Sequence, residues 1–281
     1  MPAKPNSKTK TPLARDLEIA LKKKRNPQAA AFLMRFFKTG KGEYAEGDKF
    51  LGIKVPETRA LVRDFASTPL NEIEKALQSE WHEVRLAALV LLVTKFGKRR
   101  VEPGIDPIRA KEQRAIFDLY LRSAKNINNW DLVDLSAAQI VGGMLFHDPK
   151  EREVLTKLSQ GKLLWDRRIA VIATHYALRQ KEAGLATYLS KLLLRDREDL
   201  MHKAVGWTLR ELGKRVDRKL LLAFLDEHAS VMPRTALRYA IEHLSPRERA
   251  YYMNVPRAEL SRAAVETRAV KRASDVRRSL K

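Results

Sequence analysis

The sequence predicts an all-α protein, built as a HEAT-like α-solenoid of stacked antiparallel helix pairs with a concave basic face. Apolar residues recur with the spacing of amphipathic helices in almost every segment, and the alternating pattern of strands is missing. Related segments recur at a period near 40 residues, as in two-helix repeats. With 281 residues, 44% of them hydrophobic, the chain can bury a substantial core.

Start signals accompany many of the helical segments. Pro27 and Pro56 fall in first turns, where a missing N–H costs nothing, and Asn129 and Asp217 are suited to capping. The predicted helices cover residues 13–25, 27–38, 56–66, 70–78, 81–97, 107–124, 130–145, 149–158, 164–180, 182–195, 199–215, 217–228, 232–243 and 246–252.

The repeat is visible when residues 83–89, 166–172 and 203–209 are compared. The first two segments share an acidic residue, an arginine two positions later and an apolar run containing alanine. Trp130 and Arg168 are 38 residues apart, and Arg168 and Trp207 are 39 apart. Equivalent positions of successive repeats line one surface, so we expect these three side chains to converge on one concave face.

Three regions depart from the helical pattern. Residues 39–55 contain four glycines and predict either a functional loop or a packed segment leading into the solenoid. The repeat domain is expected over residues 14–253. Residues 1–13 and 254–281 are expected to be mobile basic tails.

The composition favours a polyanionic partner. There are 55 Lys and Arg against 34 Asp and Glu, a formal net charge of +21, and nucleic acid is the commonest large polyanion in a cell. A soluble basic protein with solvated helix faces, a ribosome-associated protein and a membrane-surface binder have the same composition. Charge alone does not separate them.

Several function classes are disfavoured by what the sequence lacks. There is no cysteine, the six histidines have no metal-ligand spacing, and no HExxH, Walker A or dinucleotide motif occurs. No metal and no cofactor are therefore expected. No apolar run reaches membrane-spanning length and residues 1–13 lack a secretory pattern, so we expect no membrane partner and a cytoplasmic location, associated with the nucleoid through DNA.

Trp130 and Asp134 form the most informative local pattern, because residues one turn apart share a helix face while Asp131 points away. Alternatively, the carboxylates of Asp131 and Asp134 could complement the helix dipole, and the Trp130 indole could belong to the core. We assign that structural role to Asp131. For Asp134, structural and functional roles stay open.

A second pattern places an indole inside a basic stripe. Its members fall at i, i+4, i+7 and i+11 and are Lys203, Trp207, Arg210 and Lys214. Such a stripe suits binding to a phosphate backbone. Alternatively, it is only a solvated cationic helix face. Gly206 would allow a close backbone approach there. Arg168 shares a helix face with Trp165, and it suits either a DNA contact or an ion pair between repeats.

Four motifs, taken together and in this order, resemble the AlkD-type DNA alkylation repair glycosylases. They are Phe50-Leu51-Gly52-Ile53-Lys54-Val55-Pro56, Asn129-Trp130-Asp131-Leu132-Val133-Asp134, Trp165 with Arg167-Arg168, and Gly206-Trp207-Thr208-Leu209-Arg210. The resemblance covers about residues 14–253. It implies a HEAT-like solenoid that excises positively charged N3- and N7-alkylated purines from duplex DNA.

The resemblance also implies roles for individual residues. Trp130, Asp134 and Trp207 match the family's active-site positions, and Arg168 matches its DNA-backbone arginine. Arg210 follows as a phosphate contact and Lys54 as a DNA contact, beside the stripe residues Lys203 and Lys214. Residues 39–55 depart from the family in length, so no catalytic role is assigned to Tyr44.

The chemistry fits these residues. An alkylated purine is already cationic and leaves readily, so the remaining need is to stabilise an oxocarbenium-like sugar, which suits Asp134. Trp130 and Trp207 could hold the cation against their faces. No lysine nucleophile is required. We therefore expect a monofunctional glycosylase that leaves an abasic site, acts as a monomer on double-stranded DNA and uses no deep base-flipping pocket.

Two other hypotheses remain. A non-catalytic HEAT-repeat module could bind nucleic acid by charge alone, with Asp134 buried in capping. A solenoid scaffold could bind an acidic protein. The enzyme hypothesis requires Asp134 to face open solvent beside the basic groove and the two tryptophans.

Overall fold

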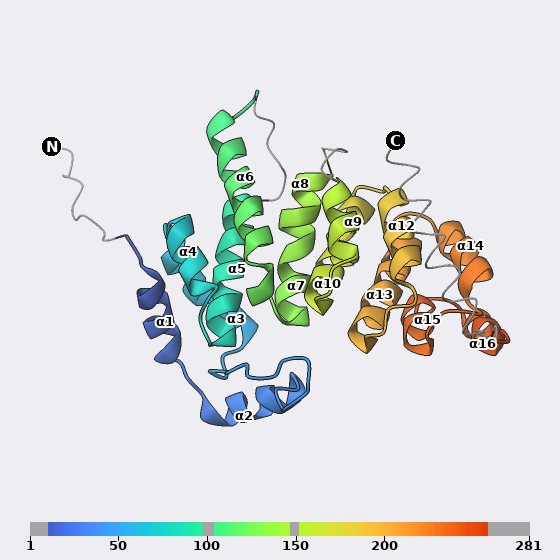
Figure 1. The fold of residues 1–281 in the computed structure, drawn as a ribbon, viewed down its shortest axis with the longest axis horizontal. Helices are drawn as coiled ribbons and strands as arrows, with labels where there is room; N and C mark the ends of the chain where they lie inside the picture. Colours follow the sequence, from blue (N-terminus) through green and yellow to red (C-terminus); the bar gives the residue numbers. More distant parts are fainter. Residues whose placement is uncertain (1–10, 98–103, 147–151, 258–281) are drawn as a thin grey trace.

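The computed structural model describes residues 11–97, 104–146 and 152–257, and within these ranges the chain is helical apart from its connections and one isolated bridge between Lys49 and Trp81 (Figure 1). The α-helices are α1 (Ala14–Lys22), α2 (Pro27–Phe36), α3 (Val55–Val62), α4 (Leu70–Ala76), α5 (His82–Phe96), α6 (Pro107–Arg122), α7 (Trp130–Ala137), α8 (Gly143–Leu145), α9 (Glu153–Ser159), α10 (Leu164–Ala173), α11 (His175–Arg179), α12 (Gly184–Leu193), α13 (Asp199–Arg215), α14 (Arg218–His228), α15 (Arg234–Ala240) and α16 (Pro246–Asn254). The predicted all-α solenoid is confirmed.

The helix boundaries agree with the predicted ranges to within a few residues, with two internal differences. The predicted helix 130–145 continues from α7 to α8 through a π-helical turn, η3 (Ala138–Gly142). The predicted helix 164–180 is interrupted at Thr174, whose hydroxyl donates to the Val171 carbonyl and so competes with the helix ladder. The start of the predicted helix 149–158 and most of both predicted tails lie outside the described residues.

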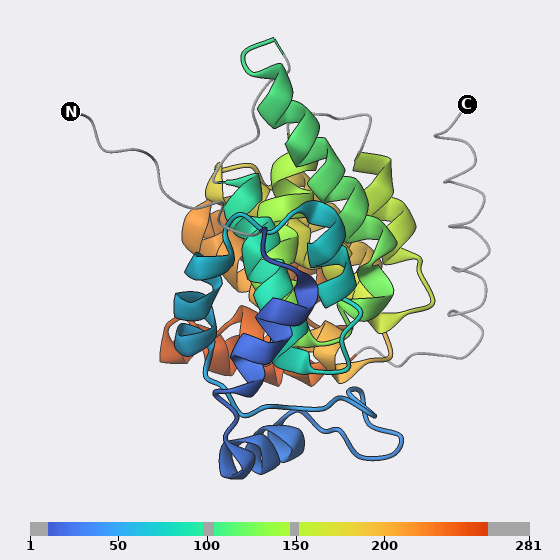
Figure 2. The ribbon, with the colours of Figure 1, turned by 90° about the vertical axis from the view of Figure 1, so that its left-hand side faces the viewer.

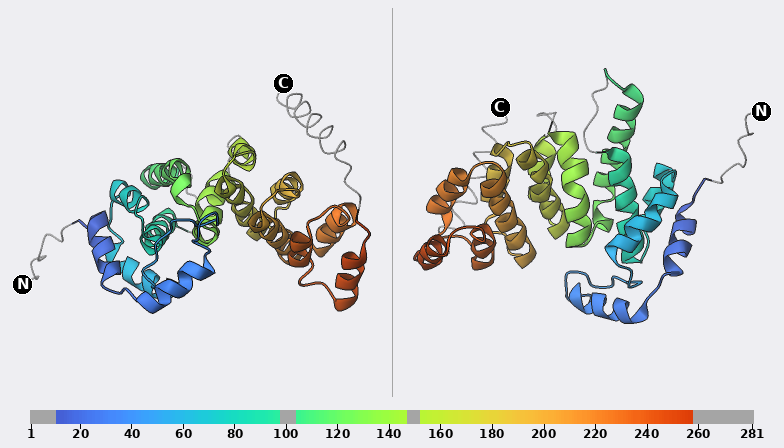
Figure 3. Two further views of the ribbon diagram at one scale, coloured as in Figure 1. Left: turned by 60° about the horizontal axis from the view of Figure 1, so that its bottom comes forward. Right: turned by 180° about the vertical axis from the view of Figure 1, so that it is seen from behind.

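The helices form two layers. An inner row runs α5, α7, α10, α13 and α15, and α6, α9, α12 and α14 lie outside it (Figures 1 and 3). Four inner helices begin at residues 130, 164, 199 and 234, so their starts are 34, 35 and 35 residues apart. The structural period in this part of the chain is therefore shorter than the predicted 40 residues.

The shorter period corrects the predicted equivalence of Trp130, Arg168 and Trp207. These residues occupy the first, fifth and ninth positions of α7, α10 and α13. Each successive residue is displaced by four positions, about one helical turn. Spacings of 38 and 39 residues thus combine a repeat of 34 or 35 with one extra turn, and the three side chains form a diagonal across the inner face.

Two glycines let neighbouring helices approach closely. A Cβ atom at Gly206 would lie 2.4 Å from the Ala236 carbonyl oxygen of α15, and one at Gly142 would lie 2.1 Å from the Ala173 carbonyl oxygen of α10. The close approach predicted at Gly206 is therefore to the next helix of the solenoid. Only glycine fits at these two contacts.

Helix α2 and residues 37–54 lie beneath the inner row (Figure 2). The C-terminal end of this segment is fixed by one buried carboxylate. Glu83 accepts hydrogen bonds from the backbone N–H groups of Leu51, Gly52 and Ile53, at 2.8, 2.8 and 3.2 Å. The end of the segment is therefore packed against α5. Among the described residues, none of the helices combines the length and apolar content that a membrane crossing needs.

Candidate active site

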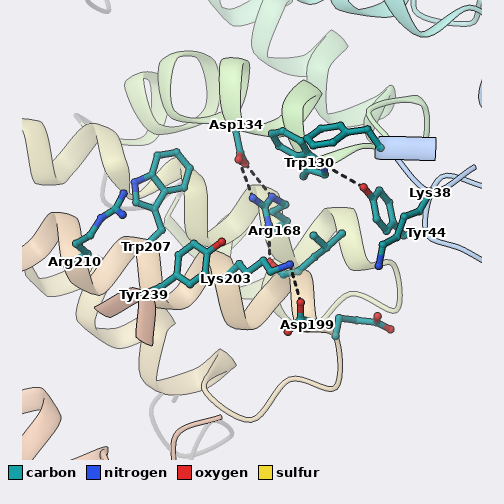
Figure 4. A pocket seen from close by; sticks show the side chains of 13 residues that line it. Lys38, Tyr44, Trp130, Asp134, Arg168, Asp199, Lys203, Trp207, Arg210 and Tyr239 are labelled. Atoms are coloured by element: carbon teal, nitrogen blue, oxygen red, sulfur yellow. Dashed lines mark hydrogen bonds and ion pairs between the residues drawn. The ribbon is translucent and has the colours of Figure 1, made fainter. Parts of the chain in front are cut away.

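A cavity of about 670 Å³ opens where α2 and the loop after it meet the inner row (Figure 4). Its lining is Phe36, Lys38, Tyr44, Trp130, Asp134, Arg168, Glu198, Asp199, Leu200, Lys203, Trp207, Arg210 and Tyr239. Six of the eight site residues proposed from sequence are in this set. Lys54 and Lys214 are exposed and lie outside the lining.

Asp134 and Arg168 form a two-pronged ion pair in the cavity wall. Arg168 donates from Nε and Nη2 to the two Asp134 oxygens, at 2.9 and 2.8 Å, and from Nη1 to the Leu200 carbonyl at 2.6 Å. The Asp134 side chain is 17% exposed. Burial raises the pKa of Asp134 above its ordinary value, and the guanidinium opposes that rise. The carboxylate is thus largely enclosed but reaches the cavity.

This geometry corrects the expectation that Asp134 faces open solvent. The binding-module hypothesis expected Asp134 to be buried in a capping role. Asn129 instead caps α7, because its side chain accepts a hydrogen bond from the Trp130 N–H. Of the two roles that the sequence allows for Arg168, a DNA contact or an ion pair between repeats, the structure shows the ion pair. Two of its five N–H groups have no partner in these three bonds, so a phosphate contact by Arg168 stays a prediction.

Trp130 forms one side of the cavity and is held by contacts from the irregular segment. Its ring stacks on Phe37 at 5.3 Å between centroids, and its Nε1 donates to the Tyr44 hydroxyl at 3.3 Å. Tyr44 also meets Trp165 edge-on at 6.2 Å. Burial raises the pKa of Tyr44, while the bond from Trp130 opposes the rise. Tyr44 therefore belongs to the site, although no periodic signal in the sequence relates it to Trp130.

Trp207 lies on the other side of the Asp134–Arg168 pair (Figure 4). Its ring meets His175 edge-on at 4.5 Å, and His175 Nε2 is 2.8 Å from the Thr208 hydroxyl. Burial lowers the pKa of His175 to about 3, so the ring under Trp207 is neutral at physiological pH. The two indoles flank the carboxylate.

The predicted basic stripe is partly neutralised. Lys203 Nζ lies 2.9 Å from an Asp199 oxygen, and this bond raises the pKa of Lys203. Arg210 pairs with Glu242. Lys38, on the opposite wall, has no ion-pair partner among the described residues. The cavity therefore combines paired cations on α13 with an unpaired one beside α2.

A buried polar cluster holds the start of α7 in place. His82 Nε2 lies 2.8 Å from Asp131, and His82 Nδ1 lies 3.3 Å from Asp48. Burial alone would lower the pKa of His82, but Asp131 and Asp48 outweigh it and raise the value to about 9. Asp131 thus points away from the cavity, as the sequence predicted, and ties α7 to α5 and to the irregular segment.

The described residues form no cluster of metal ligands. Within residues 11–97, 104–146 and 152–257, no three His, Asp or Glu side chains converge as ligands would. The chemistry available at the cavity comes from three carboxylates, two indoles, two phenols and several cations.

Comparison with known proteins gives the family. No curated protein matches the chain. A solved structure described as a predicted DNA alkylation repair enzyme from Enterococcus faecalis is similar, with a TM-score of 0.60 and 20% identity, covering 79% of this chain and 97% of that one. At that identity the likeness shows a shared fold. The profile of the family described as DNA alkylation repair enzyme matches residues 17–244, most of the sequence. The chain therefore belongs to the DNA alkylation repair enzyme family.

Proposed function

We propose that the protein is a DNA glycosylase that hydrolyses the N-glycosidic bond of cationic N3- or N7-alkylated purines in duplex DNA and leaves an abasic site. The observation that carries the proposal is the Asp134 carboxylate, fixed by Arg168, at a cavity wall between Trp130 and Trp207. Membership in a DNA alkylation repair family supports a DNA substrate.

The bond between C1′ and the purine nitrogen breaks with its electron pair moving to the purine, which becomes neutral and leaves. Positive charge then develops on the sugar ring. Water adds to C1′ and gives up a proton, so the products are a free base and a C1′ hydroxyl. Because the leaving group carries its own activating charge, the protein needs to stabilise the sugar cation and orient the water.

We assign both tasks to Asp134. A carboxylate has about four lone-pair directions and Arg168 occupies two, which leaves one on each oxygen for water or for the sugar. The guanidinium also fixes the orientation of the carboxylate, so little reorganisation accompanies the reaction. Trp130 and Trp207 can each add about 0.5 to 2 kcal/mol of cation–π attraction.

Lys203, one of two lysines that line the cavity, is unsuited to act as a nucleophile. Asp199 raises the pKa of Lys203 and keeps its ammonium charged. A charged ammonium has no lone pair with which to attack C1′. We therefore propose hydrolysis by water, giving a monofunctional enzyme that leaves the DNA strand uncut.

The test is release of free base from duplex DNA containing N7-methylguanine, with Asp134→Asn as the variant. Asparagine keeps the shape and removes the charge. The proposal predicts loss of release of at least tenfold with DNA binding retained. Wild-type protein that binds the duplex and releases no base would instead identify a nucleic-acid-binding module. Strand cleavage or a borohydride-trapped adduct would refute the water mechanism.

A further inference from the structure

Helix α2 exposes two phenylalanines beside the cavity. Phe32 is 60% exposed and Phe36 is 54% exposed, and their rings stack with centroids 6.3 Å apart and planes 15° apart. The nearby rings of Phe37 and Phe50 are only 7% and 3% exposed. The segment therefore buries some of its aromatic rings and leaves this pair in solvent.

The exposed pair is continuous with the candidate site. Phe36 lines the cavity and meets the Trp130 ring at 6.2 Å with an interplanar angle of 68°. Phe32 lies one turn earlier on the same helix face and extends the aromatic surface away from the cavity. In Figure 2, α2 lies below the other helices and apart from them.

The charges around the pair are those of a nucleic-acid contact. Helix α2 contains no acidic residue. Arg35 and Lys38 have no ion-pair partner among the described residues, whereas the cavity cations Arg168, Lys203 and Arg210 are all paired. Exposed rings next to unpaired cations provide stacking for bases and contacts for phosphates.

We propose that Phe32 and Phe36 form a stacking surface for a nucleobase that leaves the duplex stack beside the bound lesion, while Arg35 and Lys38 bind phosphates of the same strand. The inference rests on the proposed DNA substrate. In intact duplex the bases are stacked on each other, so this surface has no partner there. It favours DNA whose stacking is interrupted, and it adds a selection step before any bond is broken.

The experiment compares two uncleavable duplexes, one intact and one with a tetrahydrofuran abasic analogue that lets neighbouring bases unstack. Phe32→Ala is expected to weaken binding to the interrupted duplex by about tenfold, from the usual loss of one stacked base, and to leave intact-duplex binding unchanged. Phe32→Leu keeps an apolar side chain and should recover little. Met34→Ala, on the opposite face of α2, is the matched control and should change neither affinity.

A second readout locates the base directly. 5-Iodouracil placed next to the analogue should photo-cross-link to Phe32 or Phe36, and the same base in intact duplex should not. Equal weakening on both duplexes, full recovery by Phe32→Leu, or a missing cross-link would each overturn the stacking role. Because these duplexes are not hydrolysed, failure of the glycosylase proposal would appear separately, as wild-type protein that releases no alkylated base.

Discussion

Replacing His82 by glutamine removes the imidazolium that joins α5 to the start of α7. In the folded protein the pKa of His82 is about 9 against an ordinary value of 6.5, and the ring is buried between Asp131 and Asp48. The charged ring therefore stabilises the fold below pH 6.5. This stabilisation is lost as pH rises from 6.5 through 9, because the unfolded chain releases its proton first.

The size of the effect follows from the two pKa values. The difference between the two pKa values, about 2.5, at about 1.4 kcal/mol for each unit of pH gives about 3 to 4 kcal/mol. That is a large part of the usual stability of a domain. In the variant, Asp131 and Asp48 lose their shared positive partner, so the wild-type advantage at pH 6 should reach about this size and should shrink toward pH 10.

The assay is urea unfolding at pH values from 6 to 10, comparing wild type with His82→Gln. The difference between the two proteins isolates His82 from other groups that titrate over this range. The exposed His243, changed to glutamine, is the control and should leave the profile unchanged. A wild-type advantage that stays constant with pH would refute the assignment of a charged, buried imidazole.

Three further predictions concern the cavity and its support. Arg168→Ala leaves Asp134 buried without its partner and should destabilise the fold by about 3 to 5 kcal/mol, measured by denaturant unfolding; Arg168→Lys, which keeps the charge and loses the two-pronged geometry, should be milder. Trp207→Ala should lower kcat/KM for base release by about 2- to 30-fold through the lost cation–π contact, and an unchanged value would remove the indole from the mechanism. Gly206→Ala places a methyl group 2.4 Å from the Ala236 carbonyl and should cost about 1 to 3 kcal/mol of unfolding free energy, read from the thermal midpoint.

Local spacing explains what the sequence could predict of the site. Trp130 and Asp134 are four residues apart on one helix, so their shared face follows from helix geometry alone. The salt bridge from Lys203 to Asp199 has the same spacing and was visible in principle. The sequence overestimates the period because the tryptophan, arginine and tryptophan that mark it lie one turn further along each successive helix.

Contacts between residues far apart in the sequence could not be predicted in the same way. Tyr44 reaches Trp130 across 86 positions, from a segment without periodicity. The pairing of Arg210 with Glu242 depends on how α13 and α15 pack. The enclosure of Asp134 depends on Arg168, and the sequence does not decide whether this arginine pairs with another helix or contacts DNA. Such pairings are set by tertiary packing and not by local sequence.

Because Trp130, Arg168 and Trp207 lie on a diagonal, the site depends on the register of each inner helix relative to its neighbours. From one inner helix to the next, the marked residue moves four positions, which is about 6 Å along the helix axis. Neighbouring helix axes are about 9 Å apart. The line through the three residues thus crosses the row obliquely, at about 35°. Lengthening an outer connection would leave that line intact. Slipping one inner helix by a single turn would separate the carboxylate, the guanidinium and the indole while preserving the fold, so an inactive member of this architecture could look almost identical.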